Sequence, residues 1–556
     1  MSSAEPDMGA GESRQASPER RIVALILPEL LCELAHASAL PQVKPKKWQR
    51  KRASPLGVVL TQGLNNDEVS TDTMLDAVND EARRFGVRKG QTIAEASALV
   101  AHLRVERVTQ AAVSTALARI AEMGMAFGAT VAFEAPETIW VDITGASHLK
   151  GGEVALAHEF AARVRALGHT ARLAIASGPE LARAFARWAA PEVAESAGIF
   201  VVQSAQGASS LANLPILALP LDVDTSAWLA KLGVLRVADL LALPRESLAG
   251  RLGELAPRVF ELCSGQDNTP LVAHVPPHLI VEQRAWDEPL VGVEPLLFVL
   301  GDLVAKVSAR LIGRGEAAES LVLRISQDAA IARFHGERPE HLLRFKFATP
   351  LYREGELRRV ITARLSRAKL AAPSLGMVLE VSKRTRALAR QLELSQVVAG
   401  SLALNSTAES ELPVLLAELS ADIGEEHVGV LELFDSHRPE AKSRFARVTS
   451  LEQAPSLRKA KERAVELPDA PTRLLPVPLE LRAPLRVGSL LAIDRSLYTI
   501  ERLRFEHRLD AVEWWGQSAL SRDYIRLWLS GAAGGFEAQV FVDRSTGRRY
   551  LHAISD

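Results

Sequence analysis

Residues 137–145, which read ETIWVDITG, constrain the fold of this chain more than any other segment. Their β-branched and aromatic residues, closed by a glycine, predict a short strand that ends in a tight turn. A helix is expected to begin near Gly152. Taken alone, such a strand is common, and Glu137 would then be a solvated residue at its start. The order and spacing of other segments therefore decide what this strand belongs to.

A second strand is predicted near the N-terminus, within residues 21–29 (RIVALILPE). Pro28 lies at its end, where proline would interrupt the hydrogen bonds of an interior strand. Further along the chain, residues 79–91 (NDEARRFGVRKGQ) predict a helix that ends near Phe85, with Gly86 just beyond its end. A tight turn is then expected before another helix over 92–99.

Together these segments resemble the palm and fingers motifs of the Y-family (translesion) DNA polymerases. The family's palm strand reads Ser-x-Asp-Glu-Ala-Tyr-Leu-Asp-Val-Thr, and residues 142–144 (DIT) match its end. Residues 79–91 resemble the fingers motif Tyr-x-Ala-Arg-x-Phe-Gly-Val-x-x-Gly-Met. The family uses this arginine on the triphosphate of the incoming nucleotide, so the resemblance makes Arg83 a candidate for nucleotide and DNA binding. Asp80 replaces the family's tyrosine, and its carboxylate would repel a triphosphate.

Nucleotidyl transfer in such a palm uses two divalent cations held by carboxylate oxygens. The resemblance places Ile26 and Pro28 where the first strand has its two aspartates. Glu137 and Thr138 fall where the second strand has its Asp-Glu pair. Because at most one of three carboxylates is left, Ile26, Glu137 and Thr138 are interpreted as degenerate catalytic positions. No catalytic residue and no metal cofactor is therefore expected, and Mg²⁺ would be needed only if the chain were an active polymerase.

The expected fold class is α+β and multidomain, a Y-family polymerase-like right hand with a C-terminal extension. The composition agrees with a globular chain of several domains, since 47% of its 556 residues are hydrophobic and 24% are charged. The predicted parts, in chain order, are a disordered tail over 1–20, a palm over 21–30 and 98–215, fingers over 31–97, a thumb over 216–270, a little finger over 278–388, and a C-terminal partner-binding region over 389–556.

The formal net charge is −1, so any surface that binds DNA has to be local. Residues 232–244 resemble the helix-hairpin-helix of the family's thumb, whose backbone N–H groups near Gly233 would contact a DNA phosphate, although a generic helical hairpin is the alternative. The predicted little finger follows a βαββαβ order, and Arg344 and Lys346 on one strand are candidates for the duplex backbone. Residues 44–52 hold six basic residues in nine and fit a phosphate-contacting loop as well as a solvated one.

Residues 391–395 (QLELS) follow the predicted little finger. They resemble a sliding-clamp peptide, Gln-Leu-x-Leu-Phe, with Ser395 in place of the aromatic residue. The resemblance makes Gln391, Leu392 and Leu394 candidate clamp contacts. Loss of the buried ring would weaken clamp binding by about 3 kcal/mol. A simple linker is the alternative.

The C-terminal region contains a tryptophan pair at 514–515 and three short motifs, HRPE at 437–440, RDY at 522–524 and YLH at 550–552. With the eroded palm, this set resembles the ImuB family of catalytically degenerate Y-family relatives. The resemblance implies a non-catalytic adaptor of the bacterial mutasome in the SOS response, with DNA, a sliding clamp, an error-prone DnaE-type polymerase and an ImuA-like RecA relative as partners. An active translesion polymerase and a DNA-binding module without these partners are the alternatives.

The two cysteines, Cys32 and Cys263, lie far apart in the sequence and form no disulfide or metal-binding pattern. No apolar run reaches the length of about 18 residues that predicts a membrane-spanning helix. The cytoplasm is therefore the expected compartment, and no membrane partner is expected.

Overall fold

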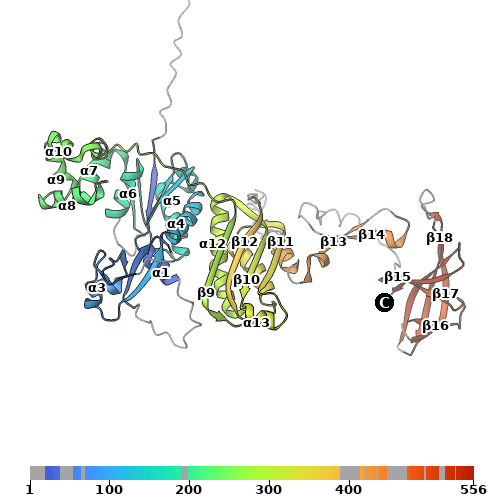
Figure 1. Cartoon of the computed structure of the whole chain (residues 1–556). Coiled ribbons are helices and arrows are strands. Elements are labelled where there is room, and N and C mark those ends of the chain that lie inside the picture. The colour runs from blue at the N-terminus through green and yellow to red at the C-terminus, as the bar shows by residue number, and fades with distance from the viewer. Residues whose placement is uncertain are drawn as a thin grey trace, which may run out of the picture. The chain divides into compact units, whose positions relative to one another are not determined.

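The computed structural model forms two compact units, which divide between residues 422 and 423 (Figure 1). It describes residues 19–37, 54–63, 69–189, 198–387, 414–420, 423–433, 436–447, 473–493, 496–512, 520–532 and 534–555. Outside these ranges fall most of the predicted tail over 1–20, the basic segment 44–52, the clamp-peptide candidate 391–395 and the tryptophan pair 514–515.

A five-stranded sheet in the order β5-β6-β1-β7-β8 forms the palm-like centre of the N-terminal unit. Its middle strand β1 (Ile22–Ile26) is antiparallel to both β6 (Thr138–Asp142) and β7 (Arg172–Ala176). The edges are β5 (Thr130–Glu134) and β8 (Ile199–Val201). Every residue of β1 is buried, which explains why this strand is apolar throughout instead of alternating.

Helices cover both faces of the palm-like sheet. On one face lie α1 (Leu30–Ala37), α4 (Gln110–Gly124) and α5 (Glu153–Ala166), which share a core with alternate residues of β1. On the other face lies α6 (Pro179–Trp188), whose apolar side packs in a second core with the remaining residues of β1. The sheet is therefore held rigidly between two apolar layers.

A three-stranded sheet in the order β3-β2-β4 forms the fingers-like part. β2 (Leu56–Thr61) is antiparallel to β3 (Ala77–Val78) and parallel to β4 (Arg104–Thr109). The helices α2 (Asp80–Arg84) and α3 (Ile93–Leu99) belong to the same part and contribute to its core. The sheet of the fingers-like part includes β4, which lies beyond the predicted end of the fingers at residue 97.

Short helices form the thumb-like part, and their apolar residues join the second core of the palm. Gly233 lies between α8 and α9, whose bounds follow, and has a φ of +81°, a backbone conformation that favours glycine. After the two short helical segments α7 (Gly207–Ala212) and η3 (Ile216–Ala218), the thumb helices are α8 (Val223–Lys231), α9 (Val237–Leu241), α10 (Arg245–Leu252) and α11 (Ala256–Cys263).

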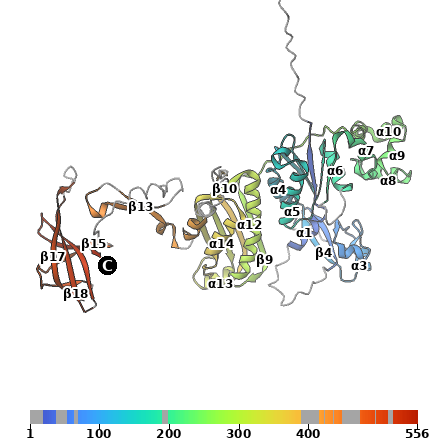
Figure 2. The ribbon, with the colours of Figure 1, turned by 180° about the vertical axis from the view of Figure 1, so that it is seen from behind.

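A four-stranded antiparallel sheet in the order β11-β10-β12-β9 forms the little-finger-like part. Two helices, α12 and α14, pack against one face and complete its core (Figure 2). The chain order β9-α12-β10-β11-α14-β12 is the βαββαβ order predicted from the sequence, with the short α13 inserted. The bounds are β9 (Ile280–Leu290), α12 (Glu294–Arg314), β10 (Glu316–Gln327), α13 (Ala329–Phe334), β11 (Glu340–Leu351), α14 (Glu354–Leu365) and β12 (Ser374–Arg386).

Residues 414–420 form a helical segment that packs on the little-finger core through Val414 and Ala417. Arg359 of α14 donates two hydrogen bonds to Glu418 of this segment, at 2.7 and 2.9 Å. These residues fall within 389–556, the predicted C-terminal partner-binding region. In the structure they belong to the N-terminal unit, because their apolar side completes its core.

The C-terminal unit contains a hairpin, β13 and β14, and a six-stranded sheet in the order β15-β20-β19-β18-β17-β16. Apolar residues on one face of that sheet form a separate core. Among the described residues of both units, no helix has the length and apolar character needed to cross a membrane. The strands are β13 (Gly429–Leu433), β14 (Ser443–Arg447), β15 (Arg473–Leu481), β16 (Leu490–Ile493), β17 (Ser496–Val512), β18 (Leu520–Gly531), β19 (Gly534–Asp543) and β20 (Arg549–Ser555).

Candidate functional site

The three degenerate positions lie together where β1 ends and β6 begins. Ile26 is opposite Thr138 in the strand register, and the backbone N–H of Leu27 donates to the Glu137 carbonyl at 2.9 Å. Ile26 and Glu137 line a pocket of about 330 Å³, and Thr138 is buried beside them. The structure therefore brings together the positions that the family resemblance selected from two distant segments.

The pocket wall carries a basic group of side chains. Arg83 and Lys89 come from the fingers-like part, Arg172 from the start of β7 and Arg187 from the last turn of α6. Of these four residues, only Arg83 is predicted from the sequence. The signal for Arg172 is the strand register, which sets it opposite Ile26, and that register is visible only once β1 and β7 are paired.

Arginines hold the carboxylates around this pocket. Arg187 Nη2 lies 2.8 Å from Glu137 Oε1. Arg83 forms ion pairs with Glu29 and, at 2.8 Å, with Asp80 Oδ1. Burial raises the pKa of Glu29, and the hydrogen bond from Arg83 opposes that rise. Asp80, which we expected to repel a triphosphate, also neutralises part of the charge on Arg83.

The side chains at the degenerate positions do not fit a pair of divalent cations. Ile26 offers no oxygen, Thr138 offers only a neutral hydroxyl, and Glu137 is already paired with Arg187. Mg²⁺ requires near-octahedral oxygen coordination that includes carboxylates. Across the residues that the structure describes, no three His, Cys, Asp or Glu side chains are grouped so that they could hold a metal ion.

The DIT residues at the other end of β6 hold strands together. Asp142 Oδ1 accepts a hydrogen bond from the Thr144 N–H at 3.0 Å, and the Thr144 hydroxyl accepts one from the Arg21 N–H at 2.9 Å. These bonds fasten the end of β6 to the start of β1. The matching part of the palm motif therefore has a structural role that does not depend on catalysis.

Comparison with known proteins identifies the family. Residues 52–187 match the family model described as impB/mucB/samB family. Protein ImuB of Caulobacter vibrioides (strain NA1000 / CB15N) is 30% identical over 406 residues, covering 70% of this chain and 84% of that protein. The chain belongs to the ImuB family. Its fold class is accordingly the expected one, an α+β multidomain right hand like that of the Y-family polymerases, with a C-terminal extension.

Polymerases are also among the proteins similar to this ImuB-family chain. DNA polymerase IV of Caulobacter vibrioides (strain ATCC 19089 / CIP 103742 / CB 15) is 30% identical over 189 residues, covering 34% of this chain and 46% of that protein. A solved Y-family DNA polymerase chimera is 14% identical with a TM-score of 0.38, covering 65% of this chain and 98% of its own.

The thumb hairpin of this ImuB-family chain satisfies several of its own amides. The N–H groups of Leu235 and Arg236 both donate to the Asp239 carboxylate, at 3.1 and 2.9 Å. The Gly233 N–H donates to the Ala230 carbonyl at 3.0 Å. These donors are already engaged within the hairpin. A role for Gly233 in phosphate binding stays a prediction.

Arg344 and Lys346 lie on the face of β11 that points away from the helices of the little finger. Both are exposed, and they alternate with buried apolar residues of the same strand. Lys383 and Arg384 on β12 are paired with glutamates instead. The strand therefore presents two cations on one solvent face, as a contact with a duplex backbone requires, and the contact itself stays a prediction.

The candidate clamp contacts Gln391, Leu392 and Leu394 lie outside the described residues, as does Ser395. The same is true of the basic segment 44–52 and of the tryptophan pair. Their proposed roles therefore stay predictions from the sequence.

The three C-terminal motifs converge on one face of the six-stranded sheet. Glu440 of HRPE lies 2.8 Å from Arg522 Nη1 and 3.5 Å from His552 Nε2. Tyr524 is fully buried, its hydroxyl accepts a hydrogen bond from Arg522 at 3.2 Å, and its ring stacks on His507 with centroids 4.8 Å apart. We call Glu440, Arg522, Tyr524 and His552 the motif cluster.

Electrostatics in the motif cluster follow from its burial. His552 is 1% exposed, and this burial lowers the pKa of its imidazole although Glu440 opposes the effect. Burial also acts to raise the pKa of Glu440, but a backbone hydrogen bond and the charge of Arg522 outweigh it and lower that pKa. Glu440 therefore stays ionised and fastens the HRPE segment to the sheet.

Proposed function

We propose that this chain is a non-catalytic adaptor of a bacterial translesion-synthesis mutasome. In this role it links a sliding clamp, an error-prone DnaE-type polymerase and an ImuA-like partner at damaged DNA, and it needs no metal cofactor. The observation that supports the proposal most directly is the pocket beside Ile26 and Thr138. There the carboxylates that would hold two cations are replaced, and Glu137 is paired with Arg187.

The part of the chain beyond the right hand supports the same proposal. Residues 423–556 form a compact unit with a core of their own. Such a unit is additional to the palm, and its surface supports a role in binding partners. The match to Protein ImuB covers 84% of that protein's length, so the similarity extends well beyond a palm domain.

Capture by immobilised partners tests the adaptor role. The full-length chain and a chain that ends at residue 422 would be passed over the sliding clamp, the DnaE-type polymerase and the ImuA-like protein of one bacterium. We expect the full-length chain to bind all three. The shorter chain keeps residues 391–395 and is expected to retain the clamp while losing at least one of the other two partners.

A Gln391→Ala variant of the full-length chain provides the matched control, because it removes one candidate clamp contact and leaves the C-terminal unit intact. We expect it to lose clamp binding and to keep the other partners. Failure of the full-length chain to bind any of the three proteins would contradict the adaptor role and favour a DNA-binding module that acts alone.

A further inference from the structure

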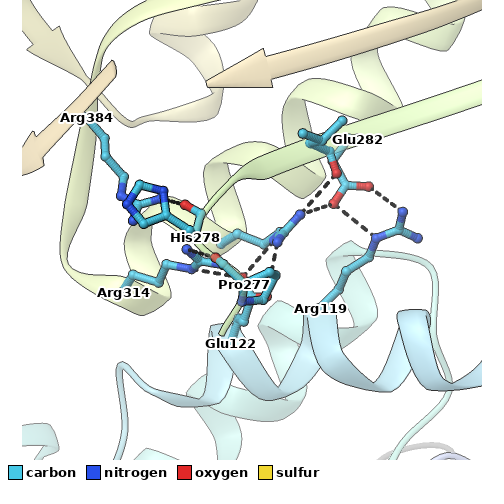
Figure 3. A network of polar contacts seen from close by, with 9 residues as sticks. Arg119, Glu122, Pro277, His278, Glu282, Arg314 and Arg384 are labelled. Carbon is cyan, nitrogen blue, oxygen red and sulfur yellow. Dashed lines mark hydrogen bonds and ion pairs between the residues drawn. The ribbon is translucent and has the colours of Figure 1, made fainter. Parts of the chain in front are cut away.

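A buried ionic network joins the palm to the little finger (Figure 3). Glu122 at the end of α4 accepts hydrogen bonds from two arginines of α12. Arg310 donates to it through Nε at 2.7 Å and Nη2 at 3.0 Å, and Arg314 through Nε at 2.9 Å and Nη2 at 2.7 Å. One palm carboxylate thus holds two little-finger guanidinium groups.

A second carboxylate, from the little finger, accepts a hydrogen bond from an arginine of the palm. Glu282 on β9 of the little finger accepts a hydrogen bond from Arg119 of α4 at 3.0 Å. It also accepts one from Arg310 at 2.9 Å, so Arg310 connects the two carboxylates. We call Arg119, Glu122, Glu282, Arg310 and Arg314 the junction network.

Four of the five side chains of the junction network are almost completely removed from solvent, and the fifth, Arg119, is 25% exposed. The side chains of Glu122 and Glu282 are 1% exposed, and those of Arg310 and Arg314 are 6% and 5% exposed. Charges at this depth are tolerated only when each keeps its partner, since an unpaired buried charge is strongly destabilising. Any movement that separated α4 from α12 would break several of these pairs together.

The backbones of α4 and α12 are also closely packed at the same place. A Cβ atom at Gly313 of α12 would lie 2.0 Å from the Glu122 carbonyl oxygen and 2.7 Å from Met123 Cα. The two helices therefore touch through their backbones. The connecting segment is fixed as well, because the His274 N–H donates to the Val131 carbonyl at 2.7 Å and Arg314 donates to the Pro277 carbonyl at 2.9 Å.

We propose that the junction network locks the palm and the little finger into one rigid body. The chain then has no hinge between these parts, and the strand face that carries Arg344 and Lys346 keeps one orientation relative to the palm whether DNA is present or absent. The lock goes beyond the adaptor role, and it depends neither on the partners nor on the loss of catalysis.

Distance measurement between two spin labels on the full-length chain tests the lock. Labels would be placed at His158→Cys on α5 of the palm and at Ala330→Cys on α13 of the little finger, both exposed positions. The natural cysteines Cys32 and Cys263 are buried, which raises the pKa of their thiols to about 12 and about 11, so they stay protonated and react poorly with the label.

We expect one narrow distance distribution that does not shift when a primer–template duplex is added. Two distances in the free chain, or a shift on adding the duplex, would overturn the lock. Neither result would bear on the adaptor role, which the capture experiment tests separately.

Two glycines of α12 provide a matched pair of variants. Gly313→Ala is expected to broaden the distance distribution or to add a second population, because the new methyl group pushes α12 off α4. Gly301→Ala is expected to leave the distribution unchanged, since the nearest atom there belongs to Arg358 at 3.8 Å.

Should Gly313→Ala fail to fold, Glu122→Gln replaces it, because it keeps the size of the side chain and removes its charge. If the distance distribution of Gly313→Ala is as narrow as that of the unmodified chain, the lock is contradicted. The same outcome contradicts it for Glu122→Gln where that variant is used instead.

Discussion

Replacing Glu122 with alanine is expected to lower the free energy of unfolding of the N-terminal unit by about 3–5 kcal/mol. The change removes the acceptor of four hydrogen bonds from Arg310 and Arg314. Both guanidinium groups would stay buried, and only Arg310 would keep a carboxylate, that of Glu282. The expected loss arises mainly from these uncompensated charges, more than from the attraction that the intact pair contributes.

Hydrogen exchange of peptides that cover α4 and α12 measures this loss locally, without assuming that the two units unfold together. Asp302→Ala is the control on the same helix. Asp302 pairs with Lys306 at 2.7 Å one turn away, and both side chains are partly exposed. That substitution is expected to change stability by about 0.5 kcal/mol or less. Equal effects of the two substitutions would mean that the junction network contributes no more than a surface pair.

Tyr524→Ala is expected to destabilise the C-terminal unit by about 3–5 kcal/mol, as truncation of a fully buried aromatic ring usually does. The ring packs between His507, Phe541 and His552, with centroid distances of 4.8, 5.8 and 5.7 Å. Its removal leaves a cavity on this face of the sheet and deprives Arg522 of a hydrogen-bond acceptor.

The control for this substitution is Phe505→Ala on the neighbouring strand β17. Phe505 is 54% exposed, so its truncation is expected to change stability by no more than about 0.5 kcal/mol. Exchange protection of peptides from β18 and β19 reports both effects. Unchanged protection in Tyr524→Ala would show that the motif cluster is a surface feature and does not hold the sheet together.

Much of the palm and little finger could be predicted because their signals are local. The β-branched run at 138–142 and the apolar run at 22–26 form strands where the sequence suggests them. The little-finger part has the βαββαβ order that the sequence predicts. The family resemblance also predicts that Ile26 lies near Thr138, because it supplies a strand register that a single sequence lacks. The structure places the two residues opposite each other.

Features that depend on long-range pairing could not be predicted. Glu122 and Arg310 are 188 positions apart, and each looks like an ordinary charged residue on its own helix. Arg172 and Arg187 join the pocket wall only through the packing of β7 and α6 around β1. The C-terminal motifs can be recognised in the sequence as three separate segments, but the sequence gives no sign that Glu440 contacts Arg522. The place of β4 in the fingers-like sheet could not be predicted, because the parallel pairing of β2 with β4 leaves no local signal.

Primer extension by the full-length chain tests the central claim most directly. The assay would use a primer–template duplex with either Mg²⁺ or Mn²⁺, with DNA polymerase IV of Caulobacter vibrioides as the positive control and a binding assay to show that the chain engages the duplex. We predict no templated extension above the level without protein, and no difference between the natural chain and Glu137→Ala. Templated synthesis that Glu137→Ala abolishes would contradict the account.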